Sequence, residues 1–129
     1  MSAPCHLWNW YAGWGLLLVA FVTGAGLGLF FHEDDFLGGY ASFPRRLIRL
    51  GHIALAALGM VNLLFALSPW PEQSHWQTAP ASMSWIIGAA TMPASCFLTG
   101  WKKTFRPLFV IPVSSLILAV TLTLWGALP

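Results

Sequence analysis

Residues 14–31 read WGLLLVAFVTGAGLGLFF, and this run contains no charged side chain. A helix needs about 20 mostly apolar residues to cross the hydrocarbon core of a bilayer. Similar runs follow at about 47–67, 83–101 and 107–128. We therefore predict an all-α integral membrane protein. Its single transmembrane domain, residues 1–129, would be a four-transmembrane-helix bundle.

The composition of the whole chain agrees with this prediction. Of its 129 residues, 57% are hydrophobic and only 8% are charged, whereas about 25% of residues are charged in soluble domains. A soluble domain of this size has too little interior to bury so much apolar surface, so the expected partner is the lipid bilayer. Basic and exposed aromatic residues are not interleaved, so we expect no nucleic-acid partner.

Prolines and a serine mark the expected ends of the apolar runs. Pro44 precedes the second run, and Pro69 and Pro71 follow it, because proline suits the first helical turn and cannot continue a helix. Ser82 is expected to be the N-cap of the third helix. Pro107 is expected in the first turn of the fourth helix.

The basic residues predict the orientation. They fall in two short stretches, Arg45, Arg46 and Arg49, then Lys102, Lys103 and Arg106. With four spans, the first and third loops share one side, and the positive-inside rule places that side in the cytoplasm. Both termini are then expected on the non-cytoplasmic side.

Most tryptophans would lie near the non-cytoplasmic interface. These are Trp8, Trp10, Trp14, Trp70, Trp76, Trp85 and Trp125, and only Trp101 would lie at the other interface. Interfacial tryptophans usually anchor helices at the headgroup level. Tryptophan is also enriched at protein interfaces, so a contact surface for another subunit is the second interpretation.

Three expected spans combine small residues with side chains that could be ligands. Helix positions four apart share a face. This spacing aligns Gly28 with His32, His52 with Ala56, and Met92 with Cys96. His52 lies about five residues into its span, or roughly 8 Å at 1.5 Å per residue. The four potential ligands, His32, His52, Met92 and Cys96, would then share the cytoplasmic leaflet.

Two kinds of site fit this pattern. A b-type haem takes axial His or Met ligands, and Gly28 and Ala56 would leave room for the ring beside His32 and His52. Arg45, Arg46 and Arg49 are close to His52 in the sequence and would pair with the haem propionates or bind lipid headgroups. A single histidine could instead hold a chlorophyll-type pigment. Alternatively, Met92 and Cys96 with His52 would suit copper or another soft metal. The same residues also fit ordinary close helix packing.

The chain resembles the small four-helix anchor subunits of respiratory and photosynthetic complexes, such as those of succinate dehydrogenase, in its size, number of spans and intramembrane histidine. The resemblance implies a non-catalytic accessory subunit of a membrane-bound electron-transfer complex that packs against other membrane subunits. The expected location is a bacterial inner membrane.

Two other functions are compatible with the sequence. A metal-handling membrane protein would use His52, Met92 and Cys96. A small transporter or channel would need a polar path through the bilayer. The candidates for such a path are Thr23, Asn62, Ser95, Thr99, Ser114 and Thr121.

Overall fold

The computed structural model describes residues 5–69 and 75–126, which form helices and connecting segments without any strand. The helices are α1 (Cys5–Phe30), η1 (Phe36–Gly38), α2 (Phe43–Leu67), α3 (His75–Trp101), η3 (Lys103–Phe109) and α4 (Val110–Gly126). The described residues contain four candidate spans, at 6–30, 43–67, 77–101 and 103–126. This confirms the all-α prediction, and the length and apolarity of the helices indicate a multi-pass integral membrane protein.

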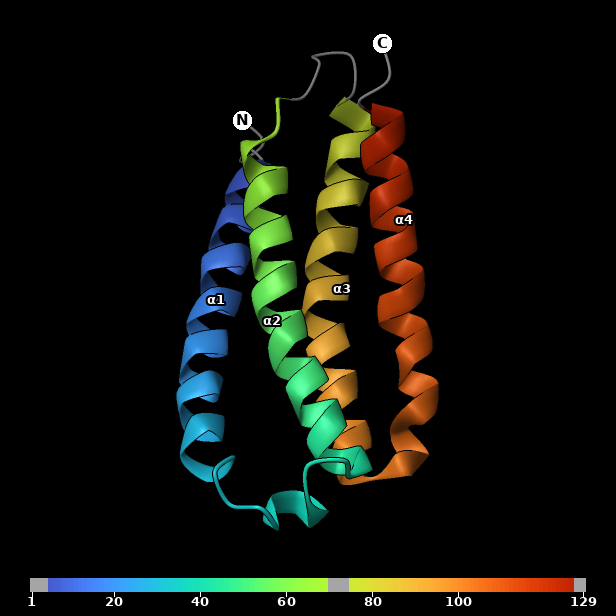
Figure 1. Ribbon diagram of the computed structural model, residues 1–129. Coiled ribbons are helices and arrows are strands. Elements are labelled where there is room, and N and C mark those ends of the chain that lie inside the picture. The colour runs from blue at the N-terminus through green and yellow to red at the C-terminus, as the bar shows by residue number, and fades with distance from the viewer. Residues whose placement is uncertain (1–4, 70–74, 127–129) are drawn as a thin grey trace.

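The four long helices run antiparallel, side by side (Figure 1). α2 packs against α1 and α3, α3 packs against α4, and α1 also reaches α3. Among the described residues no substantial contact joins α1 to α4, so these two helices form the edges of the array. α3 is the most enclosed of the long helices. Of the residues in its most apolar 18-residue stretch, 50% are buried, compared with 11% in α1 and 11% in the span that contains α4.

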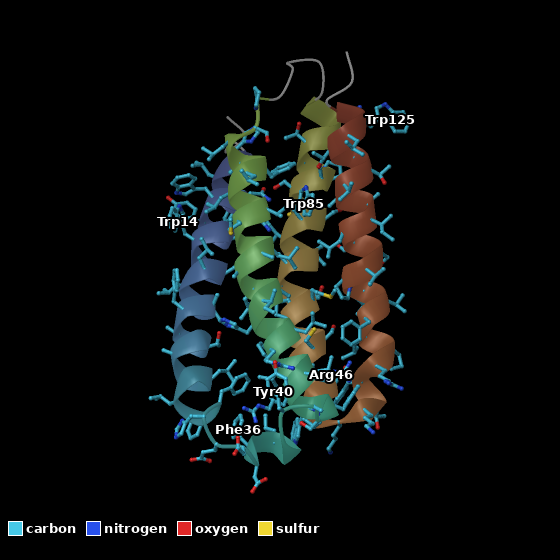
Figure 2. The ribbon with its side chains drawn as sticks, in the orientation of Figure 1. Trp14, Phe36, Tyr40, Arg46, Trp85 and Trp125 are labelled. Carbon is cyan, nitrogen blue, oxygen red and sulfur yellow. The ribbon has the colours of Figure 1, made fainter. Side chains whose placement is uncertain are left out.

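Both ends of the bundle can be recognised by their side chains. Segments 31–42 and 102–109 lie together at the lower end in Figure 1. All six Lys and Arg residues belong to these segments or to the first two turns of α2, and we call this the basic end. Figure 2 shows Trp14, Trp85 and Trp125 toward the opposite end and Arg46 and Tyr40 near the basic end. Trp70 and the side chain of Trp76 lie outside the described residues.

Two helices begin earlier than their apolar runs. α1 starts at Cys5 and α3 at His75, so the prediction that Ser82 is an N-cap was wrong. Ser82 lies inside α3, where its buried hydroxyl donates a hydrogen bond to Asn9 Oδ1 of α1. Polar residues such as Asn9 and Ser82 lower the hydropathy of both segments, but their mutual hydrogen bonds make helical packing favourable there.

The start of α2 agrees with the position predicted from its proline, whereas the start of α4 does not. The Ser42 hydroxyl accepts a hydrogen bond from the Arg45 backbone N–H, and Pro44 lies in the first turn of α2. Pro107 instead belongs to η3, and α4 begins at Val110. Pro112 has no N–H to donate to Leu108, and its ring would crowd that carbonyl in an α-helix. The chain is therefore 3₁₀-helical before Val110.

Glycines permit the closest contacts between the helices. A Cβ built on Gly13 of α1 would lie 2.9 Å from the Gly59 carbonyl oxygen of α2 and 2.6 Å from Leu63 Cγ. A Cβ on Gly88 of α3 would lie 2.5 Å from Leu116 Cδ2 of α4. Helices in membranes commonly approach each other through such small residues.

Candidate functional site

His52 lies between α2 and α1. Its Nδ1 is 3.2 Å from Thr23 Oγ1, and a Cβ on Gly24 would lie 2.8 Å from its Cε1. The imidazole therefore occupies the space that Gly24 leaves open. Both of these contact residues belong to α1, whereas the sequence predicted Ala56, in the same helix as His52, as the small residue beside it.

The hydrogen bonds of Thr23 favour one tautomer of a neutral His52. Thr23 Oγ1 is 2.7 Å from the Val19 carbonyl oxygen and 3.1 Å from that of Ala20. When its single hydrogen is donated to one of these carbonyls, its oxygen is free to accept a hydrogen bond from Nδ1–H of His52. Nε2 then carries the lone pair. In the described part of the chain Nε2 has no hydrogen-bond partner, and it is not fully enclosed.

An apolar hollow of about 430 Å³ lies beside this pair. It is lined by residues of all three neighbouring helices, Thr23, Gly26, Leu27, Phe30, Ile48 and Phe97. Thr23 thus borders the hollow and also holds His52. The hollow gives an apolar ring or chain a place to lie against α1, although the imidazole itself is not part of its lining.

The other predicted haem-site residues lie in different surroundings. His32 follows the end of α1, and its side chain is exposed. Gly28 faces open space, because a Cβ there would have no neighbour within 4 Å. Ala56 is half-buried one turn from His52, while the Arg49 guanidinium carbon lies 4.4 Å from the ring centroid of Tyr40.

The predicted sulfur ligands belong to another interface. Cys96 is buried against α2, with its Cβ 3.1 Å from a Cβ built on Gly51, and Met92 is half-buried one turn away. His52 instead contacts α1, so His52 and Cys96 lie on different sides of α2. Among residues 5–69 and 75–126, no group of three or more His, Cys, Asp and Glu could hold a metal ion.

A buried polar cluster, which the sequence did not predict, joins three helices near the end opposite the basic end. Asn9 Nδ2 donates to Asn62 Oδ1 at 2.8 Å, and Ser82 donates to Asn9 Oδ1. Asn62 Nδ2 also donates to the Leu58 carbonyl at 2.9 Å. Asn9 and Asn62 have no exposed surface. Because these side chains satisfy one another, the cluster fixes the register of α1, α2 and α3.

Arg45 has a structural role that its neighbours lack. It is only 4% exposed, and its guanidinium donates to the backbone carbonyls of Phe31, Glu33 and Asp34. These carbonyls lie just beyond the last turn of α1, where the helix dipole favours a cation. Arg45 therefore fastens the first loop to α2.

Three further cations of the basic end contact aromatic rings. Lys103 Nζ and the Arg106 guanidinium carbon lie 5.2 Å and 5.4 Å from the centroid of Phe43. Lys102 Nζ lies 5.3 Å from the centroid of Trp101. A ring attracts a cation without neutralising it, so these three groups keep their positive charge.

The candidate residues of a polar path have different surroundings. Thr23, Ser114 and Thr121 each donate to a carbonyl of their own helix, and Asn62 belongs to the buried cluster. Ser95 and Thr99 are buried in α3. Three of the five candidate hydroxyls are therefore used within their own helices, whereas Thr99 Oγ1 has no hydrogen-bond partner in the described part of the chain. Comparison of the chain with protein-family models, curated proteins and solved structures finds no match.

Proposed function

We propose that this chain is a small accessory subunit of a larger membrane-bound electron-transfer complex. The observation that carries the proposal is the open Nε2 of His52. A neutral imidazole whose second nitrogen has no partner is costly at membrane depth, and ionisable side chains there usually serve a function. A haem, a pigment or a hydrogen-bond donor of a neighbouring subunit would provide the missing partner.

The exposed helix faces support an accessory role. α1 and α4 are edge helices with large exposed side chains, including Phe21 at 74% and Leu124 at 64%. Trp8, Trp14 and Trp125 are more than half exposed. Lipid covers such faces, but an open row of helices with exposed tryptophans also suits packing against other membrane subunits.

The geometry at His52 supports a b-type haem or a chlorophyll-type pigment as the partner of Nε2. Metal-ligating histidines commonly donate their second N–H to a fixed acceptor, which sets the tautomer and the ring orientation. Thr23 Oγ1, 3.2 Å from Nδ1, can serve as such an acceptor. A haem held there would supply one-electron redox chemistry. A second protein ligand would be supplied by a neighbouring subunit, because the His32 side chain is exposed beyond α1.

The proposed orientation follows the positive-inside rule. The basic end would face the cytoplasm, and both termini would face the opposite side of a bacterial inner membrane. The position of segments 31–42 and 102–109 at the same end of the bundle supports this orientation (Figure 1).

The test is purification of the full chain from its native membrane in mild detergent, followed by an absorption spectrum and identification of the bound subunits. We expect a haem or chlorin band that His52→Leu abolishes and His32→Gln leaves unchanged. We also expect copurified subunits that carry redox cofactors.

Two results would count against separate parts of the proposal. If the wild-type complex showed no haem or chlorin band, the proposed cofactor would be contradicted. Copurification of redox subunits would still support the accessory role. A chain recovered alone from gently solubilised membranes, with no redox subunit, would overturn the accessory role itself.

A further inference from the structure

A hollow of about 500 Å³ lies on the outer face of α2 at the basic end. It is lined by Phe43, Arg46, Leu47, Arg49, Leu50 and Ile53. These positions recur every three or four residues, so they lie along one face of the helix. From Phe43 to Ile53 this face extends about 15 Å at 1.5 Å per residue. The hollow therefore runs from the end of the bundle toward its middle.

The outer part of the hollow is positively charged. Arg46 is exposed, and Arg49 is half-buried against Tyr40. Lys103 and Arg106 lie over Phe43 at the same end. In the described part of the chain no carboxylate lies within 4.0 Å of these four basic groups. The guanidinium groups are thus available to an anion, and arginine matches phosphate oxygens particularly well.

The inner part of the hollow is apolar. Leu50 and Ile53 lie one and two turns beyond Arg46 and are 47% and 60% exposed. No described helix covers this part of α2. A free phosphate ion would use only the charged part, whereas a phospholipid would use both parts, with its phosphate at the arginines and an acyl chain along the two aliphatic side chains.

We propose that this hollow binds one anionic phospholipid, with the phosphate held by Arg46 and Arg49. The proposal does not depend on the function proposed above. It rests on charge complementarity and on the direction of the hollow. A partner helix is less suited to this surface, because an apolar helix seated there would bury two arginines without anions.

The binding test uses the delipidated full chain in mild detergent and native mass spectrometry. The chain is titrated with phosphatidylglycerol, phosphatidylcholine, inorganic phosphate or the tail-free glycerophosphoglycerol headgroup. We expect one phosphatidylglycerol to bind at least tenfold more tightly than phosphatidylcholine. We expect no detectable binding of the headgroup or of phosphate at the same concentrations.

Two matched variants distinguish lipid binding in the hollow from general attraction of anionic lipid to the basic end. Arg46→Gln should weaken phosphatidylglycerol binding at least fivefold. Lys102→Gln removes one charge from the same end but lies outside the hollow, so it should change binding less than twofold. Circular dichroism of both variants checks that the helices are intact.

Three outcomes would overturn the proposal. Equal weakening by Arg46→Gln and Lys102→Gln would show unspecific attraction. Equal binding of phosphatidylglycerol and phosphatidylcholine would show that the charge does not select the lipid. Displacement of the lipid by inorganic phosphate at equal concentration would assign the hollow to a free anion.

Discussion

At the scale of single residues, two neighbouring arginines in one sequence stretch have different roles. Arg45 is buried and bonded to three backbone carbonyls, whereas Arg46 is exposed beside the hollow on α2. The difference arises because their side chains leave α2 about 100° apart. One points under the first loop and the other points away from the bundle.

The first prediction concerns Arg45. Arg45→Ala should lower the free energy of unfolding by about 2 kcal/mol, because it removes charged hydrogen bonds to carbonyls at the end of α1. Hydrogen exchange of residues 31–42 should also become faster. Arg46→Ala is the matched control, with an expected change below about 0.5 kcal/mol. Equal effects of both variants, measured without anionic lipid, would contradict the capping role of Arg45.

The second prediction concerns the buried amide cluster. Asn9→Leu should lower the free energy of unfolding by about 1–2 kcal/mol, because it removes the hydrogen bonds to Asn62 and Ser82. The control is Thr121→Val, whose exposed hydroxyl donates only to its own helix. Unfolding in a mixed-micelle titration would measure both effects.

A double-variant cycle sharpens this test. Asn9→Leu with Asn62→Leu should cost less than the sum of the two single substitutions, because the two side chains bond each other. Strict additivity would show that the hydrogen bond between them contributes little to stability.

At the scale of the helices, packing depends on which glycine faces a neighbour. Gly13 and Gly15 are both in α1, two residues apart. Gly13 lies against the backbone of Gly59, but a Cβ on Gly15 would meet nothing within 4 Å. Positions two apart point to opposite sides of a helix, so the same residue type serves close packing at one position only.

The third prediction follows from this pair. Gly13→Ala should destabilise the protein by about 1–3 kcal/mol, because the new Cβ overlaps Leu63 Cγ and the Gly59 carbonyl. Gly15→Ala should be neutral or slightly stabilising, because alanine favours the helix. Thermal unfolding followed by circular dichroism compares the two. A larger loss for Gly15→Ala would mean that α1 faces α2 with a different side.

At the scale of the whole molecule, the even number of spans and the basic end predict the topology. A reporter that is active only outside the cytoplasm, such as alkaline phosphatase, should be active when fused after Pro129. It should be inactive after Gly39 in the first loop. A green fluorescent protein fusion should give the reverse pattern, because it folds in the cytoplasm.

The same fusions would also reveal the opposite orientation. Phosphatase activity after Gly39 and none after Pro129 would invert the orientation. The proposed phospholipid site would then lie in the non-cytoplasmic leaflet, although its residues and their contacts would be unchanged.

The amino-acid sequence by itself determined the number of long helices and their approximate positions. Apolar length is a property of each segment alone, so the charge-free run at 14–31 indicates a spanning helix whatever surrounds it. The sequence also grouped the basic residues into two alternate loops. It missed the first turns of α1 and α3, because Asn9 and Ser82 lower hydropathy while their hydrogen bond stabilises the packed helices.

Only the tertiary structure decided which side chains meet. His52 was expected beside Ala56 and near Cys96, but its ring lies over Gly24 and its Nδ1 bonds to Thr23. Cys96 faces Gly51 on another side of α2. Such pairings depend on the rotation and register of each helix against its neighbours. These are set by close packing and buried hydrogen bonds between helices distant in sequence, which no single segment encodes.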